Sequence, residues 1–166
     1  MITVLAVDLS LNRTGMAVIK YNEGEFTILE KITVDNTRFR PKESGKKLYF
    51  INAAIIRVLK EYDVDYVVRE RGFSRFNAST QALFKAAGVY EYSIFEAIQT
   101  TGKLIVQADD IAPTTIKKML TGSGVASKDD VAEAVAEFGP YRNNDESDAV
   151  ALGVAFIKKI TGGVLT

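Results

Sequence analysis

The sequence predicts an α/β protein with a five-stranded mixed sheet, its first three strands antiparallel, flanked by helices on both faces. Apolar runs separated by turn residues fill the first 34 residues, two short strand-like segments later in the chain each follow a helical segment, and the last third shows helical spacing. A strand reached through a helical crossover runs parallel to its neighbour, so the sheet should be mixed. The 166 residues, 47% of them hydrophobic, should form a single domain over residues 1–166.

The chain opens with three predicted antiparallel strands. The apolar run over residues 2–7 is typical of a buried strand, and it ends in a single carboxylate, Asp8. A turn over residues 9–15 leads to a second strand over residues 16–19, and residues 26–34 have the composition of a third.

The next part of the chain alternates a helix with a short strand. Residues 35–45 are polar and basic and contain a proline, which indicates a loop. Apolar residues then recur at helical spacing from Ser44 to Tyr62, which predicts an amphipathic helix packed on the sheet. The β-branched segment 65–70 follows as a strand, and it too ends in an acid, Glu70.

The rest of the chain is predicted to be mainly helical. A loop over residues 71–77 precedes a long helix from Ala78 to Thr100 with a face of small residues, and residues 103–107 form the fifth strand. Pro113 suits the first turn of a helix through Leu120, and Ser127 suits the cap of a helix over residues 128–138, with Asp130 at the capping-box position. The last helix is expected to turn four residues inward: Ala149, Leu152, Phe156 and Ile160.

The composition excludes several kinds of site. Without cysteine there are no disulfides, iron–sulfur clusters or thiolate zinc sites, and without histidine there is no Ser-His-Asp or Cys-His arrangement. No signal-peptide pattern opens the chain, and the longest late apolar run, residues 149–157, is shorter than the roughly 20 residues that span a bilayer. We therefore expect a cytoplasmic protein with no membrane partner.

Charge is balanced in total, with 21 basic and 21 acidic residues, but segregated along the chain. Acids crowd residues 129–148, whereas residues 38–47 hold one acid, Glu43, against five basic side chains: Arg38, Arg40, Lys42, Lys46 and Lys47. This segregation suits a protein that grips phosphate in one place and metal in another, and the basic segment could hold a DNA arm. Such clusters are also often only solubilising, so charge alone leaves both interpretations open.

Four acids could form one site. Asp8 and Glu70 each end a predicted strand, and neighbouring parallel strands bring their carboxyl ends to one edge of the sheet. Asp145 and Asp148 are three residues apart at a helix start, which puts them on one face. Each acid could instead serve a turn or a helix start, where acids are common.

If the four acids converge, they need cations, because four ionised carboxylates repel one another. An all-oxygen site without histidine or cysteine suits Mg²⁺, with Mn²⁺ able to substitute. Two such ions could clamp the attacking water and the leaving oxygen of a phosphodiester, with Asp8 bridging both ions. The chemistry expected of such a site is phosphodiester hydrolysis.

Five segments, taken together in order and spacing, resemble the RuvC-type Holliday-junction resolvases of the ribonuclease H-like superfamily. The similarity covers nearly the whole chain and is compatible with a virus-encoded or divergent member. It rests on Asp8 at its strand end with Thr14-Gly15, residues 67–73, Thr115-Ile116-Lys117, residues 122–131, and residues 145–149.

The resemblance implies a ribonuclease H-like fold and a Mg²⁺-dependent endonuclease that resolves four-way DNA junctions by paired symmetric cuts. It implies that two ions are held by four carboxylates: Asp8, Glu70, Asp145 and Asp148. It also implies that Lys117 and Lys128 lie near the scissile phosphate, that Phe73 wedges into the junction, and that a homodimer is built on the helix from Ala78 to Thr100. Arg71 and Arg75, which flank Phe73, suit phosphate contacts by their position.

Two features depart from the family pattern. Leu9-Ser10 follows Asp8 where members commonly have Pro-Gly, and the balanced charge contrasts with the more basic bacterial members. Other functions remain open from the sequence: a broader branched-DNA or flap nuclease, a nuclease for RNA–DNA hybrids, or a non-catalytic branched-DNA-binding protein. An actin-like nucleotide-binding protein would need two such halves, for which 166 residues leave no room.

Overall fold

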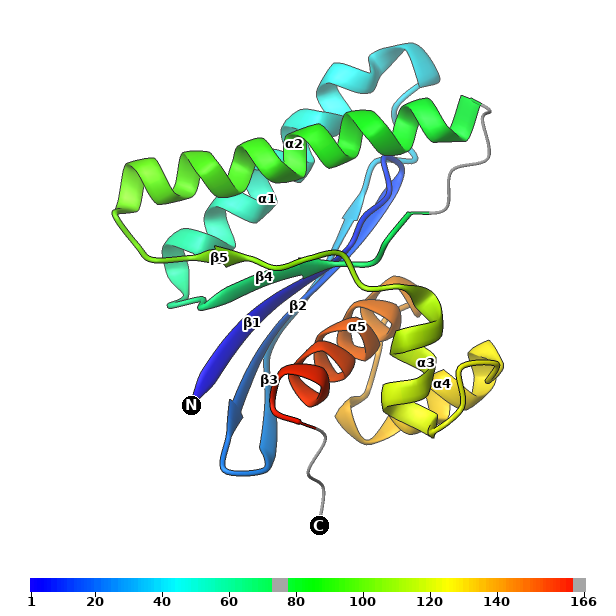
Figure 1. Ribbon diagram of the computed structural model, residues 1–166. Helices are drawn as coiled ribbons and strands as arrows, with labels where there is room; N and C mark the ends of the chain where they lie inside the picture. The colour runs from blue at the N-terminus through cyan, green and yellow to red at the C-terminus, as the bar shows by residue number, and fades with distance from the viewer. Residues whose placement is uncertain (73–77, 163–166) are drawn as a thin grey trace.

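A computed structural model describes residues 1–72 and 78–162, in which one five-stranded sheet lies between two layers of helices (Figure 1). The strands are β1 (Ile2–Asp8), β2 (Arg13–Asn22), β3 (Glu25–Asp35), β4 (Tyr66–Arg69) and β5 (Val106–Gln107). The helices are α1 (Ser44–Glu61), α2 (Ala78–Thr101), α3 (Pro113–Thr121), α4 (Lys128–Ala134) and α5 (Asn144–Ile160), with short 3₁₀ helices at Pro41–Glu43 and Ala136–Phe138. Among the described helices, none is both long and apolar enough to cross a membrane.

The sheet has the strand order β3-β2-β1-β4-β5. The β1–β2 and β2–β3 pairs are antiparallel, whereas the β1–β4 and β4–β5 pairs are parallel. The mixed sheet with three antiparallel strands at the start is therefore confirmed. Val7 pairs with Arg69 across β1 and β4, so the carboxyl ends of these two strands lie side by side.

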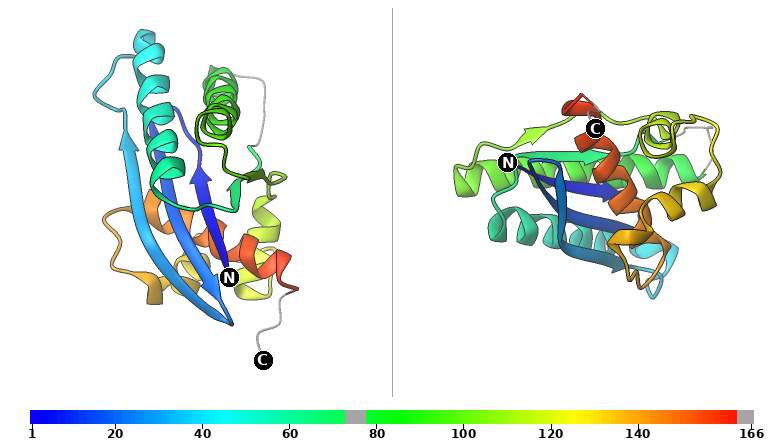
Figure 2. Two further views of the ribbon diagram at one scale, coloured as in Figure 1. Left: turned by 90° about the vertical axis from the view of Figure 1, so that its left-hand side faces the viewer. Right: turned by 90° about the horizontal axis from the view of Figure 1, so that it is seen from below.

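Alternation along the buried strands separates two hydrophobic cores. Val4 and Ala6 of β1 face the core that contains α5, whereas Leu5 and Val7 face the core formed with α1 and α2. Figures 1 and 2 show the corresponding layers, with α1 and α2 on one side of the sheet and α3, α4 and α5 on the other. This alternation decides the face on which side chains at the strand ends lie.

Two details of the last helices differ from the prediction. The expected helix over residues 128–138 ends at Ala134, where the backbone hydrogen bonds change to the 3₁₀ pattern: the N–H of Phe138 donates to the carbonyl oxygen of Val135 (3.1 Å), which also accepts from Tyr141 Oη (2.5 Å). The prediction that Ile160 points inward is wrong: it is the last residue of α5, and 41% of it is exposed. The predicted capping box of Ser127 and Asp130 is confirmed.

The first turn is shorter than predicted. Strand β2 begins at Arg13 rather than Met16, because its ladder with β1 continues to the pair Asp8–Gly15 and its ladder with β3 continues to the pair Arg13–Asp35. Only residues 9–12 remain to connect the two strands, and Gly15 lies directly beside Asp8.

Candidate active site

The two strand-end acids lie at adjacent positions and are directed to the same face of the sheet. Val4 and Ala6 face α5, so the period of two places Asp8 on that face. Tyr66 and Val68 of β4 pack in the same core, so the same alternation places Glu70 on the face of the sheet that is covered by α5. Since Val7 pairs with Arg69, the next residues of both strands bring the two carboxylates to one edge.

Gly15 allows the start of α5 to approach this edge. It pairs with Asp8 in the β1–β2 ladder, and a Cβ atom at this position would collide with the carbonyl oxygen of Asp145. The first turn of α5 therefore lies directly on β2, and it carries Asp145 and Asp148 toward Asp8.

A set of hydrogen bonds fixes the start of α5. Asn143 caps the helix, its Oδ1 accepting from the backbone N–H of Glu146 (3.1 Å). The Glu146 carboxylate is only 1% exposed and accepts from the Nε (2.6 Å) and the backbone N–H (2.9 Å) of Arg142. Arg142 also donates to the carbonyl oxygen of Lys31 in β3 (2.9 Å), so the turn before α5 is tied to the sheet.

Three of the predicted acids and both predicted lysines line one pocket of about 260 Å³. These residues are Asp8, Glu70, Asp148, Lys117 and Lys128, and Pro113, Ile116 and Val131 complete the walls. Helix α3, which carries Lys117, is brought there by the connection before it, where the backbone N–H of Arg71 donates to the carbonyl oxygen of Ile111 (2.7 Å). Lys128 begins α4, and its Nζ lies 3.9 Å from Asp148 Oδ2.

Asp145 is close to this pocket but turned toward Arg13. Its Oδ2 lies 2.9 Å from Arg13 Nε, although the two atoms are not aligned for a hydrogen bond, so the attraction is mainly electrostatic. The charge of Asp145 nonetheless contributes to raising the pKa of both Asp8 and Asp148.

Burial and mutual repulsion destabilise the ionised acids. Burial, which has the largest effect, and the charges of Asp148, Glu70 and Asp145 together raise the pKa of Asp8 to about 7, although the charge of Lys128 opposes the shift. Burial also raises the pKa of Glu70 and of Asp148, while Lys128 lowers both. The pocket therefore disfavours the simultaneous ionisation of its acids unless further positive charge enters.

The donor atoms of this pocket suit a hard divalent cation, because they are carboxylate oxygens with an unrelieved negative charge. Among residues 1–72 and 78–162, however, no three acidic side chains are already arranged to hold one ion. Asp145 is engaged by Arg13, and Asp148 is near Lys128. Metal binding would therefore require rotation of side chains, with the backbone elements already in place.

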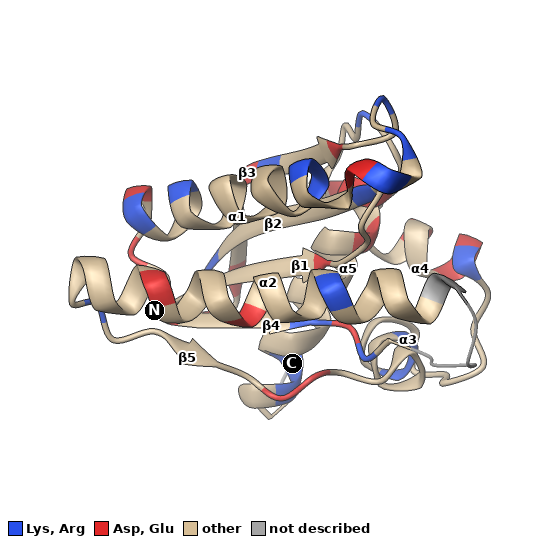
Figure 3. Ribbon diagram, turned by 90° about the horizontal axis from the view of Figure 1, so that it is seen from above, with Lys and Arg blue, Asp and Glu red and all other residues tan. Residues whose placement is uncertain are grey.

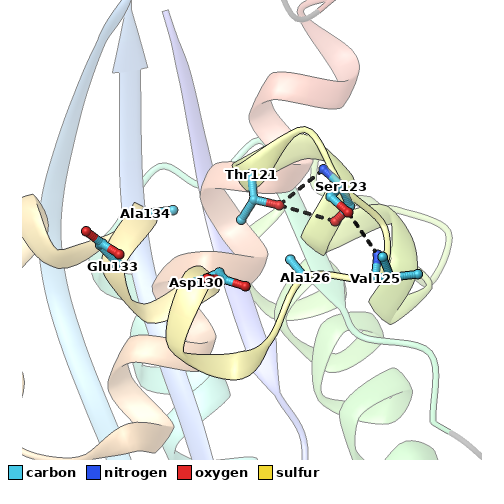
Figure 4. Close-up of a pocket in the computed structure, with 7 residues that line it drawn as sticks. All are labelled: Thr121, Ser123, Val125, Ala126, Asp130, Glu133 and Ala134. Carbon is cyan, nitrogen blue, oxygen red and sulfur yellow. Dashed lines mark hydrogen bonds between the residues drawn. The ribbon is translucent and has the colours of Figure 1, made fainter.

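A larger cavity, of about 580 Å³, lies between α3 and α4 (Figure 4). Thr121 and Ser123 line it, and their hydrogen bonds are made locally around the turn. The two acids in its lining are Asp130, which belongs to the capping box, and Glu133. Its lining contains no basic side chain, so we do not assign it a phosphate-binding role.

The predicted DNA-contacting residues have different surroundings. Phe73 and Arg75 lie outside the described residues, and Arg71 is exposed. The Arg38 guanidinium lies over the ring of Phe39 (4.8 Å).

The other basic residues of segment 38–47 do not form one uniform loop. Arg40 and Lys46 both pair with Glu43, at 3.4 and 2.7 Å, and Lys42 is exposed. Lys47, the last member of the segment, lies in the first turns of α1, in agreement with the helix predicted from Ser44, and is only 4% exposed.

Sequence reasoning did not identify the contacts of Arg13, Arg142 and Glu146 that position α5. The spacing of Asn143 and Glu146 at the helix start was a usable signal, because an N-cap residue followed three residues later by glutamate is common at helix starts. The Arg13–Asp145 pair gave no local signal, since it joins residues 132 positions apart that meet only in the folded chain.

Comparison with known proteins agrees with this geometry. A RuvC protein of Ehrlichia ruminantium, a crossover junction endodeoxyribonuclease, is 25% identical over 161 residues, which cover 95% of this chain and 97% of the relative. Its counterpart in Pseudarthrobacter chlorophenolicus is 30% identical over 157 residues, covering 91% and 77%. The solved structure of T. thermophilus RuvC in complex with Holliday junction substrate superposes with a TM-score of 0.82 at 22% identity, over 98% of this chain and 97% of that one.

The structural similarity confirms the ribonuclease H-like α/β fold that the sequence predicted. The model of the family described as crossover junction endodeoxyribonuclease RuvC matches residues 4–156. That range includes the two strand-end acids, both lysines and the start of α5. On this evidence the chain belongs to the RuvC family of crossover junction endodeoxyribonucleases.

Proposed function

We propose that this protein is a Mg²⁺-dependent endonuclease that resolves four-way DNA junctions by hydrolysing one phosphodiester in each of two strands. The observation that carries the proposal is the convergence of Asp8, Glu70 and Asp148 with two lysines on one pocket at the carboxyl ends of β1 and β4. Family membership supports the junction as substrate, and the solved T. thermophilus relative is bound to one.

Asp8, Glu70, Asp145 and Asp148 would hold two Mg²⁺ ions, and Mn²⁺ could substitute because it prefers the same oxygen ligands. Such ions supply activation of the attacking water and neutralisation of the charge that develops on the phosphate. Asp8 is the best candidate for a shared ligand, because the charges of the other three acids all reach it.

The two lysines have a role that follows from the charge of the reaction. Negative charge grows on the phosphate oxygens as the water attacks, and a cation positioned at those oxygens stabilises that charge. Lys117 and Lys128 line the pocket from α3 and α4, and both lower the pKa of Glu70. We assign them to binding the non-bridging oxygens of the scissile phosphate.

The proposal is tested by cleavage of strand-labelled four-way junction, flap, RNA–DNA hybrid and plain duplex, each with and without Mg²⁺. We expect paired, symmetric nicks in the junction that require the metal. Equal cutting of flaps would widen the function to a branched-DNA nuclease, and preferential cutting of the hybrid would replace it with a ribonuclease. Junction binding without any cleavage in Mg²⁺ or Mn²⁺ would contradict the enzymatic proposal.

We further propose that the active form is a homodimer built on α2, which would present two pockets for two symmetric cuts. The inward face of this helix is buried through Ala86, Tyr90 and Ala97. Its outward face carries an exposed stripe of three large side chains at helical spacing: Phe84, Tyr92 and Phe95, exposed by 61%, 58% and 60%. A stripe of this kind is typical of a surface covered by a partner.

Replacing Phe84 and Phe95 together with serine is expected to raise the dissociation constant of the dimer by about 100-fold or more, because a two-fold interface loses each contact twice. Sedimentation measures the dimer, and plasmid-borne junctions show whether two strands are cut in one binding event. Leu104→Ser is the matched control, because this side chain is 95% exposed and lies off the stripe. A double variant that remains dimeric would contradict this interface.

A further inference from the structure

We propose that a second pocket, between the loop after β1 and the helices α1 and α2, binds one backbone phosphate of the DNA outside the catalytic pocket. This inference rests on the proposed function, because it takes DNA as the substrate. The pocket has a volume of about 240 Å³, and its polar lining consists of Asn12, Ser44, Lys47, Gln81 and Lys85. The lining contains two lysines and no carboxylate, which suits an anion.

Lys47 is the central group of this pocket. It is only 4% exposed, and its Nζ donates a hydrogen bond to Asn12 Oδ1 (2.6 Å). Within residues 1–72 and 78–162, no carboxylate oxygen lies within the 4.0 Å that defines an ion pair with it. A buried ammonium that lacks an anionic partner is costly, and a phosphate oxygen in the pocket would supply one.

The position of Lys47 is built into the fold. Asn36, which is 1% exposed, donates from its Nδ2 to the carbonyl oxygens of Leu11 (3.2 Å) and Lys47 (3.0 Å). Its backbone N–H donates to the carbonyl oxygen of Asn12 (2.8 Å). One buried side chain thus holds the loop after β1 against the start of α1, so that Asn12 and Lys47 keep their mutual orientation.

Helix α2 supplies the second cation. Gln81 and Lys85 are four residues apart, so they share a face of the helix, and both are exposed. Lys85 forms no ion pair within the part of the chain that the structure describes. Figure 3 shows the basic band of α2 and the basic start of α1 at the same end of the two helices.

The pocket lies close enough to the catalytic acids for both to contact one DNA molecule. Asn12 follows Asp8 by four residues, which can span about 14 Å at most. Phosphates recur along one strand about every 3.4 Å of helix axis. The proposed subsite would therefore hold a phosphate within about four nucleotides of the cleavage position.

Salt dependence of junction binding tests the subsite directly. Binding is measured in EDTA, so that no cleavage occurs, for the wild type, Lys85→Gln, Lys47→Met and the control Lys60→Gln at the far end of α1. A variant that loses one phosphate contact should have a dissociation constant about threefold or more above that of the wild type over the range from low to physiological salt. It should also reduce the slope of log K against log salt by about 0.9. Lys85→Gln is decisive if Lys47→Met proves unfolded, because Lys85 is exposed.

Asn12→Asp tests whether the pocket recognises charge rather than shape. The new carboxylate would give Lys47 a permanent anionic partner, so the Tm should rise while affinity for the junction falls. Asn12→Ser, which removes the amide without adding charge, serves as the matched comparison. An aspartate variant that binds the junction as tightly as the wild type would overturn the proposal.

The phosphate itself is located with neutral methylphosphonate linkages placed singly at the first four positions on either side of the cut. One linkage should weaken binding by the wild type and weaken binding by Lys85→Gln clearly less, because only the Lys47 contact is left to lose in the variant, which is the signature of a direct pair. Equal losses in both proteins at every position would overturn the subsite. If the wild type neither binds nor cuts junctions, the proposed function itself fails, whereas normal wild-type binding with unchanged variants rejects the subsite alone.

Free phosphate is the other possible source of the same anion. The Tm is compared in potassium phosphate and in KCl of equal ionic strength. A phosphate-specific rise that disappears in Lys85→Gln, combined with an unchanged DNA salt slope, would assign the pocket to a free anion and contradict its role in holding DNA.

Discussion

Replacing Asp8 with asparagine is expected to abolish DNA cleavage and to stabilise the metal-free protein at pH 8. Cleavage should fall by at least about 1,000-fold, since an ion that loses its shared ligand no longer supplies several kcal/mol of transition-state stabilisation. Stability should rise because the variant removes a carboxylate charge that is disfavoured by burial and, in addition, by repulsion from the neighbouring acids. The measurements are single-turnover cleavage in Mg²⁺ and thermal unfolding in EDTA.

The size of the stability gain depends on pH. The pKa of Asp8 is raised from 3.8 to about 7, so the folded state holds a proton that the unfolded state releases. The wild type therefore loses stability as pH rises from about 4 to about 7, up to about 4 kcal/mol in total. Asparagine has no such dependence, so the two unfolding curves should coincide near pH 4 and separate above it. At pH 8 the Tm difference should be roughly 5–15 °C.

Mg²⁺ should remove much of this difference by stabilising the wild type and not the variant. Asp109→Asn is the matched control, because Asp109 is exposed and lies on the connection before α3. It should change cleavage little and the free energy of unfolding by at most about 0.5 kcal/mol. An Asp8→Asn protein that cuts within tenfold of the wild type would exclude Asp8 from the catalytic site, and equal Tm values at pH 8 would contradict the raised pKa of Asp8.

Gly15→Ala is expected to impair both stability and cleavage although it adds only one methyl group. The new Cβ would meet the carbonyl oxygen of Asp145, which is backbone and cannot rotate away. The first turn of α5 must then move off β2, at a cost of about 1–3 kcal/mol, and a displacement of about 1 Å at the catalytic acids can cost 100-fold in rate. Chemical denaturation and single-turnover cleavage measure the two effects.

Gly45→Ala is the control for the same change in another place. Gly45 lies in the first turn of α1, nothing lies within 4 Å of a Cβ built there, and alanine favours a helix. This variant should be unchanged in cleavage and slightly more stable. If Gly15→Ala cuts at the wild-type rate, the close approach of α5 to β2 is not needed for the site.

Local patterns were sufficient for most of the fold and for the direction of the strand-end acids. The period of two in β1 and β4 is a property of neighbouring residues, and it places Asp8 and Glu70 on one face before any tertiary contact is known. The end of α4 could not be predicted in this way, because the carbonyl of Val135 is shared between the backbone N–H of Phe138 and the hydroxyl of Tyr141, a contact that depends on the path of the following turn.

Side-chain contacts between segments that are distant in the chain could not be predicted from the sequence. Lys47 looks like one more basic residue in a charged segment, and only the folded contacts of Asn36 and Asn12 bury it. The contact between Arg13 and Asp145 depends on a connection of only four residues after β1, whereas the sequence predicted a turn over residues 9–15.

The turn before α5 has a further consequence for the sheet. Strand β3 is eleven residues long and lies at the edge of the sheet, so one of its sides is open to pairing with another chain. Lys31 donates to the carbonyl oxygens of Phe138 (3.0 Å) and Pro140 (2.7 Å), and Arg142 donates to the carbonyl oxygen of Lys31. The segment that leads into α5 thus also covers part of this edge, so the same few hydrogen bonds shield the edge from pairing and fix the start of α5.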